Sequence, residues 1–401
     1  MRPFASTISL DDAQRRLASN VRPIDRTERV ALWDAAGRVA AEDVTSPMDV
    51  PPFARSAMDG YAVIAADTAA ARRETPVRLQ RIARVFTGEV SPLALMTGTC
   101  IEIATGAPLP RGADAVVMVE ETRLKGDDVD ILSAASPGQH VGRRGADIAS
   151  GDRVLSSGEA LTPSRVGALA AIGRTGIEVY ARPRVAILST GNEVVEPGHP
   201  LGSGQIYDVN RFTLAAIVAA HGGVPQPHSA AQDSLDALGA ALDDCAHADL
   251  IVFSGGSSVG DRDLVADAIA ARGEMIFHGI AVRPGKPTAF ARVRGTPFFG
   301  MPGNPTSCLS NAYILLVPFL RACARLPPHV PHVAQFPLGR RIASAVGRHQ
   351  FYTVRVQDGV AMPAFKGSGD ITSLSRADGY IEIPASQNVV EEGETVAVTL
   401  F

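Results

Sequence analysis

The chain has 401 residues, of which 46% are hydrophobic and 20% are charged, and its formal net charge is −4. By the usual size of domains, this length predicts about two to four globular domains. The nearly balanced charge argues against a disordered chain and against a surface built to bind nucleic acid. The four cysteines are scattered and form no Cys-x-x-Cys pair, so neither a disulfide framework nor a zinc site is indicated.

The sequence also argues against membrane insertion. Arg2 is followed by Asp11 and Asp12 without the apolar segment of a signal peptide between them. The longest apolar run, Leu309 to Leu320, is too short to span a bilayer. We therefore expect a cytoplasmic protein.

The N-terminal part combines helical and β-type patterns. Ser9 and Asp12 form a capping-box-like start of an amphipathic helix. Further on, short β-type runs are separated by turn signals, at 77–85, 99–104, 115–119 and 129–132. We expect a discontinuous helical domain, residues 1–50 and 142–178, into which a β-rich domain, residues 51–141, is inserted.

Three turns of this part carry polar side chains that could act on a ligand. Asp59 lies among small residues directly before Gly60, and Thr105 lies at a strand end beside a glycine. Arg143 and Arg144 stand between two glycines and could form a fork for an oxyanion. A turn-forming aspartate and a solvated basic turn remain the alternatives at these positions.

From residue 179 to 327 strands and helices alternate, which predicts an open α/β sheet. Its predicted strands end at Ser189, Ser254, Arg283 and Gly300, each before a turn stiffened by glycine or proline. The carboxyl ends of parallel strands lie along one edge of a sheet, where ligands bind. We therefore expect these four turns to converge.

The turn after Ser254 is rich in glycine and precedes a predicted helix, a geometry in which backbone N–H groups bind phosphate. Asp261 and Asp263 in this turn would repel phosphate unless a divalent cation lay between them, and together with Glu193 they suit Mg²⁺. Lys286 is a fixed cation between prolines. This set favours phosphoryl or phosphoanhydride chemistry by charge stabilisation, whereas the alternative is a tight βα turn with a capping aspartate.

Beyond residue 328 the chain is rich in proline and then in extended runs, which predicts a small C-terminal β domain, residues 328–401, of barrel-like form. Its one stretch with the character of a site is Phe365 to Ile371, which includes Ser368. A solvated turn is the alternative for this stretch.

Six motifs together resemble the molybdopterin molybdenumtransferase family, from the N-terminal helix to the C-terminus. They are Ser56-Ala57-Met58-Asp59-Gly60-Tyr61-Ala62, Thr105-Gly106-Ala107-Pro108, Ser189-Thr190-Gly191-Asn192-Glu193, Ser254-Gly255-Gly256-Ser257-Ser258-Val259-Gly260, Pro284-Gly285-Lys286-Pro287 and Pro302-Gly303-Asn304-Pro305. The resemblance implies a multi-domain α/β plus β protein with a central three-layer molybdopterin-binding domain.

The resemblance also implies an activity, a cofactor and an assembly. The protein would insert molybdate into adenylylated molybdopterin with the help of Mg²⁺ and release AMP. It would work as a homodimer whose active cleft lies between the α/β domain of one subunit and the β-rich domain of the other. The resemblance leaves open whether tungstate replaces molybdate, whether a molybdopterin adenylyltransferase docks on the protein, and which molybdoenzymes it serves.

Motif by motif, the resemblance assigns roles to individual residues. The catalytic set is Asp59, Thr105, Glu193, Asp263 and Lys286. Glu193 and Asp263 would also hold Mg²⁺. The substrate-binding set is Arg143, Arg144, Asp147, Ser254, Gly255, Gly256, Ser258, Arg283, Pro302, Asn304, Ser307 and Ser368.

The chain departs from the family pattern at several positions. Gly142 stands where the family often has the first of three arginines, and Thr353 stands where a Phe-x-Arg motif is common. Arg355 lies two residues on and, at the period of a strand, could face the same side. Ser257 and Asn192 replace a usual valine and aspartate. A non-catalytic molybdopterin-binding or scaffolding paralogue is therefore the alternative hypothesis.

Overall fold

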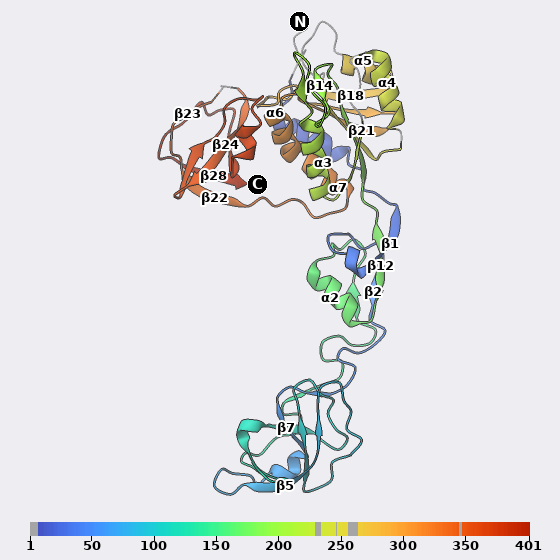
Figure 1. Ribbon diagram of the computed structural model, residues 1–401, viewed down its shortest axis with the longest axis vertical. Helices are drawn as coiled ribbons and strands as arrows, with labels where there is room; N and C mark the ends of the chain where they lie inside the picture. Colours follow the sequence, from blue (N-terminus) through green and yellow to red (C-terminus); the bar gives the residue numbers. More distant parts are fainter. Residues whose placement is uncertain (1–6, 229–233, 246, 256–263, 345–346) are drawn as a thin grey trace. The chain divides into compact units, whose positions relative to one another are not determined.

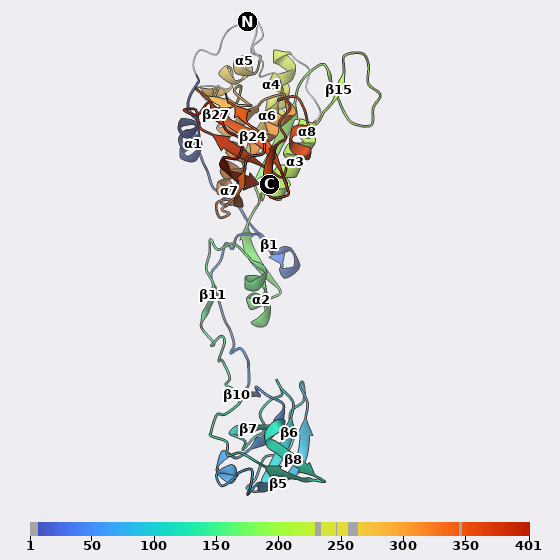
Figure 2. The same cartoon turned by 90° about the vertical axis from the view of Figure 1, so that its left-hand side faces the viewer.

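The chain forms two compact units in the computed structural model, which describes residues 7–228, 234–245, 247–255, 264–344 and 347–401 (Figure 1, Figure 2). Unit 1 comprises Met1–Glu28, Gly37–Val39 and Val179–Phe401, and unit 2 comprises Arg29–Ala36 and Ala40–Glu178. Unit 2 is thus an insertion in the sequence of unit 1. The chain passes from unit 1 into unit 2 within β1 (Thr27–Ala31) and returns to unit 1 within β12 (Gly176–Tyr180). The finer division into four domains stays a prediction.

A six-stranded sheet forms the centre of unit 1 (Figure 1). Its strands lie in the order β16 (Val224–Pro227), β13 (Arg184–Ser189), β17 (Leu250–Ser254), β21 (Thr296–Met301), β20 (Ala289–Val293) and β18 (Gly273–His278). The first four strands are parallel, whereas β20 pairs antiparallel with both β21 and β18. The predicted open α/β sheet is confirmed, with an antiparallel edge in addition.

Helices cover both faces of this sheet, because successive residues of a buried strand point to opposite sides. Ile187 of β13 packs in the core on one face, together with α1, α3 and the helix that follows β21. Its neighbour Leu188 packs on the other face, against α4 and α5. The helices are α1 (Leu10–Ser19), α3 (Asn210–Ala220), α4 (Leu235–Asp244) and α5 (Leu264–Ala270). The three-layer arrangement expected for this part is confirmed.

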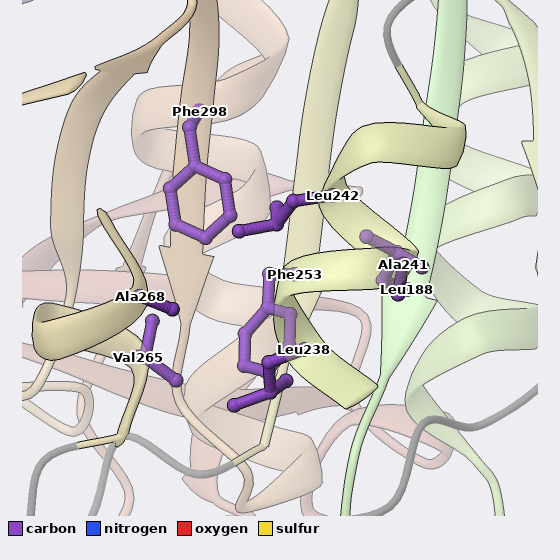
Figure 3. A pocket seen from close by; sticks show the side chains of 8 residues that line it. All are labelled: Leu188, Leu238, Ala241, Leu242, Phe253, Val265, Ala268 and Phe298. Carbon is purple, nitrogen blue, oxygen red and sulfur yellow. The ribbon is translucent and has the colours of Figure 1, made fainter. Parts of the chain in front are cut away.

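The face under α4 and α5 is a packed core. Figure 3 shows eight apolar side chains that point toward one another there, among them Leu242 and Phe298. The cavity between them measures about 10 Å³. This space has about the size of one water molecule, so the cavity between these eight side chains has no room for a substrate.

One long helix after β21 runs through the opposite core. It consists of α6 (Pro305–Asn311), a π-helical turn (Ala312–Leu316) and α7 (Val317–Cys323). By length and composition alone, Pro305–Cys323 could cross a membrane, but 72% of its apolar window is buried inside the protein. It is the core helix of a globular unit, packed with Phe290 and Phe299 of the sheet.

The C-terminal part of unit 1 is a second sheet (Figure 1). Its strands are β19 (Val282–Arg283), β24 (His349–Gln357), β26 (Gly379–Ile383), β28 (Thr395–Leu400) and β22 (Val333–Pro337), with β25 (Val360–Pro363) paired to β24. The predicted strands near 352–356, 379–383 and 395–401 are confirmed. β23 (Ile342–Ala343), β27 (Val389–Val390) and the short helix α8 (Thr372–Ser375) complete this part.

The strand that ends at Arg283 belongs to this C-terminal sheet, because β19 pairs with β24. The expectation that it ends at the edge of the central sheet was therefore wrong.

Unit 2 is built on a third six-stranded sheet. The order is β7 (Ala115–Met118), β4 (Gly60–Val63), β6 (Thr99–Ile103), β5 (Val77–Val85), β9 (Asp128–Ile131) and β8 (Thr122–Lys125). Tyr61 and Ala62 of β4 contribute to two different apolar cores on its two sides. The predicted β-type runs of this region are confirmed.

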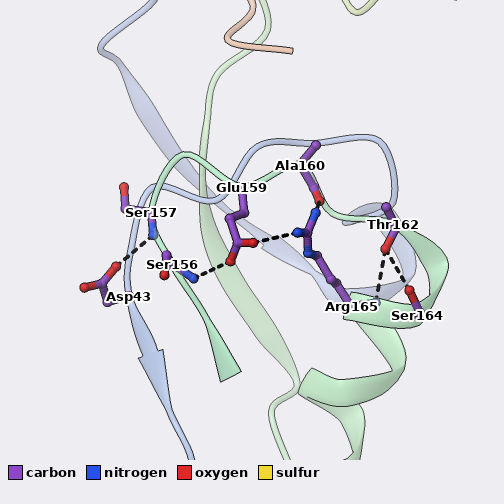
Figure 4. Close-up of polar contacts among 8 residues, drawn as sticks. All are labelled: Asp43, Ser156, Ser157, Glu159, Ala160, Thr162, Ser164 and Arg165. Carbon is purple, nitrogen blue, oxygen red and sulfur yellow. Dashed lines mark hydrogen bonds and ion pairs between the residues drawn. The ribbon is translucent and has the colours of Figure 1, made fainter. Parts of the chain in front are cut away.

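Small elements complete unit 2. They are β2 (Val44–Thr45), β3 (Arg55–Ser56), β10 (Val141–Gly142), β11 (Arg153–Leu155) and α2 (Pro163–Ala171). Figure 4 shows the contacts around the start of α2, where Arg165 binds Glu159 at 2.6 Å and Thr162 caps the helix. Glu159 in turn accepts a hydrogen bond from the Ser156 N–H, at 2.7 Å. These contacts stabilise a helix of only nine residues.

Candidate functional site

Three turns meet at the carboxyl ends of β13, β17 and β21 in unit 1. The Thr190 N–H donates to the Ser254 carbonyl at 3.0 Å, which joins the first two strand ends. Gly255 has a φ of +112°, and a Cβ there would lie 2.3 Å from the Thr190 carbonyl oxygen. A Cβ on Gly303 would lie 3.6 Å from the Gly255 Cα. The structure thus brings these three predicted turns together, and the close approach requires glycine at 255.

Glu193 places a carboxylate directly after β13. Gly191 has a φ of +140°, and a Cβ there would lie 2.7 Å from Glu193 Oε1, so the carboxylate folds back over the glycine. The backbone around it is held by the parallel pair β14 (Val194–Val195) and β15 (Ile206–Tyr207). Glu193 is exposed, and its carboxylate has no hydrogen-bond partner among the residues that the structure describes. A free oxygen donor of this kind fits Mg²⁺.

Several predicted residues lie outside the described part of the chain. They are Gly256, Ser258 and Asp263, together with Asp261. The second predicted Mg²⁺ ligand therefore stays a prediction.

The start of α6 contacts the predicted C-terminal stretch 365–371. The Asn304 Nδ2 donates to Ser368 Oγ at 3.0 Å, and the Thr306 N–H donates to the Ser368 carbonyl at 3.1 Å. Thr306 Oγ1 also donates to the Asp370 carbonyl at 2.7 Å. The structure thus brings Asn304 and Ser368 together. Of the neighbouring predicted residues, Pro302 and Ser307 are buried, whereas Asn304 is exposed.

The loop that carries Arg283 and Lys286 is hydrogen-bonded to α6. Asn311 Nδ2 donates to the Gly285 carbonyl at 2.9 Å and to Thr288 Oγ1 at 2.6 Å. The Lys286 carbonyl accepts the N–H groups of residues 280 and 288. Lys286 is half-buried and Arg283 is exposed. α6 therefore positions two of the predicted loops at once.

Two residues before and at the start of α3, Asp208 and Asn210, were not predicted as site residues. Asp208 accepts a hydrogen bond from Ser189 Oγ at 2.6 Å, at the end of β13. Asn210 Nδ2 donates to Ser254 Oγ and to the Gly303 carbonyl, both at 2.7 Å. This short segment therefore contacts all three strand-end turns.

The same contact region contains two buried polar atoms, Asn210 Oδ1 and Thr190 Oγ1, that have no hydrogen-bond partner among the residues described. Buried polar groups are normally satisfied, and unsatisfied ones gather where a ligand or ion binds. These two atoms are therefore candidates for contacts with a bound molecule.

A larger apolar hollow of about 630 Å³ lies beside α3. Phe212, Tyr313 and Phe401 are among its lining side chains, and Asp208 is its charged residue. Ile371, at the end of the predicted stretch 365–371, lines it, but no described residue of the predicted catalytic and substrate-binding sets does.

In unit 2, Asp59 and Thr105 are direct neighbours. Asp59 Oδ1 accepts a hydrogen bond from the Thr105 N–H at 2.7 Å. Thr87 Oγ1 donates to the Thr105 carbonyl at 2.8 Å, and the Val119 N–H donates to the Asp59 carbonyl at 3.1 Å. Both Asp59 and Thr105 are exposed. The structure thus brings this predicted pair together on the surface of unit 2.

The two predicted arginines of unit 2 have different surroundings. Arg144 Nε donates to Asp49 Oδ2 at 2.6 Å. The Ser150 N–H and then the Arg144 guanidinium hold the pKa of Asp49 below its usual range. Arg143 and Asp147 are exposed, and their side chains have no polar partner in the part of the chain described.

One of the four cysteines contacts a predicted site residue, because Cys308 Sγ donates to Ser254 Oγ at 3.9 Å. Burial raises the pKa of the Cys100 and Cys308 thiols to about 12, and that of Cys245 and Cys323 to about 11. All four are free and buried. They are protonated at neutral pH and are therefore neither nucleophiles nor metal ligands there.

Three protein-family models match the chain. The MoeA N-terminal region (domain I and II) matches residues 8–173, the probable molybdopterin binding domain matches 186–322, and the MoeA C-terminal region (domain IV) matches 335–401. The chain belongs to the MoeA family. The resemblance seen in the motifs is confirmed.

Curated MoeA relatives match over nearly the whole chain. Molybdopterin molybdenumtransferase 2 of Mycobacterium tuberculosis is 38% identical over 96% of both chains, and the molybdopterin molybdenumtransferase of Haemophilus influenzae is 33% identical over 98% of both. Two crystal structures of molybdopterin biosynthesis MoeA proteins from Pyrococcus horikoshii match with TM-scores of 0.84 and 0.83. They are 39% and 30% identical and cover 98% and 99% of this chain, and 99% and 100% of theirs. The MoeA fold is therefore established here.

Proposed function

We propose that the protein inserts molybdate into adenylylated molybdopterin in a Mg²⁺-dependent reaction that releases AMP. Its relatives over nearly the full length are named molybdopterin molybdenumtransferase, so it is an enzyme of the transferase class in molybdenum cofactor biosynthesis. The observation that carries the finer proposal is the meeting of three strand-end turns beside the exposed Glu193 carboxylate. Molybdate and molybdopterin are the substrates.

The turns supply backbone and hydroxyl groups for the pyrophosphate of the substrate. Ser254 and Gly255 stand at the end of β17, where N–H groups that lack an internal partner bind anions. Glu193, with Asp263, would hold Mg²⁺, which when bound neutralises charge on the phosphoanhydride. Cleavage of that bond releases AMP.

The cationic loop and the start of α6 would hold the second substrate. Lys286 and Arg283 supply positive charge for an oxyanion, which suits molybdate. Ser307 and Ser368 supply hydroxyl groups, and Asn304 is already oriented by its hydrogen bond to Ser368. In this arrangement the backbone of the cationic loop is held in place before the substrate binds, which favours electrostatic catalysis.

A turnover assay tests the proposal. Adenylylated molybdopterin, molybdate and Mg²⁺ are mixed with the protein, and AMP is measured. We expect AMP release that requires both molybdate and Mg²⁺, and its loss in Asp263→Ala. Tight binding of adenylylated molybdopterin without AMP release would instead support the scaffold alternative.

We further propose that the enzyme is a homodimer, in which the Asp59 region of one subunit and the Glu193 region of its partner act on one substrate. Asp59→Asn and Glu193→Gln subunits, coexpressed with different tags, test this. Each variant alone should be inactive, whereas the doubly purified mixed dimer should regain about half of the wild-type activity, since one of its two symmetric sites is intact. A mixed dimer as inactive as its parents would contradict the shared site. The cytoplasmic location remains a prediction.

A further inference from the structure

Arg55 is a cationic residue of unit 2 that lies between two candidate loops. β3 pairs antiparallel with β10, and Arg55 is directly opposite Gly142. On its other side, Arg55 forms an isolated bridge with Pro108, in the turn that begins at Thr105. The neighbouring Ser56 exchanges two backbone hydrogen bonds with residues 106 and 107 of that turn, at 2.8 and 3.0 Å. The position of Arg55 is therefore fixed by both loops.

The Arg55 side chain lies across Gly142. A Cβ built on Gly142 would lie 3.4 Å from Arg55 Cγ and 3.8 Å from its Nε. The backbone at Gly142 has no positive φ that would demand glycine. A methyl group at this position would therefore only touch the aliphatic stem of Arg55 at van der Waals distance, and it takes a larger side chain to compete with the stem for space directly beside Arg143.

Of the three arginines near this turn, Arg55, Arg143 and Arg144, one is ion-paired and two are not. Arg144 is paired with Asp49 at 2.6 Å. Arg55 and Arg143 are exposed, and neither guanidinium has a hydrogen bond or ion pair within the described part of the protein. A guanidinium stays charged at every physiological pH and presents a planar set of donors to an oxyanion. Two unpaired guanidinium groups thus flank the turn that starts at Gly142.

We propose that Arg55 is a substrate-binding residue, which together with Arg143 binds an oxyanion group of the substrate. Arg144 instead holds the loop in place through Asp49. The inference rests on the proposed function, because the anion would be the phosphate of adenylylated molybdopterin or the molybdate. The inference adds Arg55 to the predicted substrate-binding residues and assigns to Arg144, which is one of them, the role of holding the loop.

The test measures steady-state AMP release and equilibrium binding of adenylylated molybdopterin, with full-length Arg55→Ala, Arg55→Lys and Gly142→Val. Removal of one charge-assisted contact should raise the KM of the substrate that carries the anion about ten- to hundredfold, with a smaller effect on kcat. If the anion is the phosphate, the KM and the dissociation constant of adenylylated molybdopterin rise, and if it is molybdate, the KM for molybdate rises instead. Arg55→Lys should recover part of this loss. Gly142→Val should reproduce the loss with the charge still present, because its side chain displaces the stem of Arg55.

Arg123→Ala, at an exposed arginine of β8 in the same unit, is the matched control and should behave as wild type. Thermal unfolding verifies that all variants fold. Arg55→Ala with the affinity and KM of Arg123→Ala would overturn the inference and leave the proposed function intact. Wild-type protein that binds adenylylated molybdopterin but releases no AMP would refute the proposed reaction, while the affinity of Arg55→Ala would still decide on Arg55.

Discussion

Glu193 owes the position of its carboxylate to a glycine two residues earlier. At Gly191 the φ of +140° and the 2.7 Å between a built Cβ and Glu193 Oε1 leave no space for a side chain. We therefore expect Gly191→Ala to displace the carboxylate and to lower Mg²⁺-dependent AMP release at least about tenfold, since positioned electrostatic groups of this kind are worth a few kcal/mol.

Backbone strain alone could also reduce activity, and Gly198→Ala controls for it. Gly198 lies in the next loop, between β14 and β15, with a φ of +100°, but nothing lies within 4 Å of its built Cβ. Both variants should lose about 1–2 kcal/mol of unfolding free energy from strain, measured by urea denaturation. Only Gly191→Ala should lose activity. Equal activity of the two variants would contradict the role given to the glycine.

At the scale of elements, the first turn of α3 binds the ends of β17 and β21 through hydrogen bonds. Asn210→Ala removes both Nδ2 hydrogen bonds, to the Gly303 carbonyl and to Ser254 Oγ, and leaves the buried Ser254 Oγ with only the weak contact from Cys308 Sγ at 3.9 Å. We expect a loss of about 2–3 kcal/mol of unfolding free energy and a lower rate of AMP release. Chemical denaturation monitored by circular dichroism measures the first, and the turnover assay measures the second.

Asn192→Ala is the matched control for this element. Asn192 is an exposed amide of the turn after β13, with no side-chain hydrogen bond in the part of the chain described. Its replacement should change the unfolding free energy by less than about 0.5 kcal/mol. If Asn210→Ala were as stable as this control, α3 would not be fastening the strand ends.

The sequence predicted most strands, but not which sheet each one joins. Periodicity identifies a strand from neighbouring residues, so the β-type runs of unit 2 and those ending at Ser189 and Ser254 were found. Val282–Arg283 joins the C-terminal sheet through pairing with His349, a contact that local pattern does not encode. Asn210 was missed for the same reason, since its partners are 44 and 93 residues away. Turn signals and residue chemistry selected Glu193, Asp59 and Thr105, and the motif resemblance assigned them catalytic roles, which stay predictions.

At the scale of the whole molecule, Asp249 links distant parts of unit 1. Its carboxylate binds the Arg26 guanidinium with two hydrogen bonds, at 2.7 and 2.8 Å, and accepts the Arg184 N–H at 2.7 Å. Burial alone would raise the pKa of Asp249, but the Arg26 and Arg184 contacts outweigh it, so the pKa lies below its usual value. The N-terminal segment, β13 and the start of β17 are joined at this one carboxylate.

This lowered pKa predicts how stability depends on pH. A carboxylate with a lower pKa in the folded state stabilises the fold above its unfolded pKa, and this contribution is lost as the pH falls through the folded value. Asp249→Asn should therefore lower the unfolding free energy by about 1–3 kcal/mol at neutral pH. The difference in unfolding free energy between the variant and the wild type should become smaller as the pH falls toward about 3. Urea unfolding at several pH values measures this difference, and Glu74→Gln, at an exposed glutamate, is the control. A gap that is constant with pH would contradict the linkage.

The π-helical turn between α6 and α7 has a consequence for the evolution of this chain. Such a turn accommodates one residue more than a regular helix would. Deleting one residue of Ala312–Leu316 would therefore convert the π turn into regular α-helix and leave both halves in place, with Asn311 still at Gly285 and Phe319 still among the aromatic rings. The same deletion within α6 or α7 would rotate one half by about 100° relative to the other. The π turn is thus the position in this helix where the chain length can change by one residue while the first half keeps its contact with the loops and the second half keeps its place in the core.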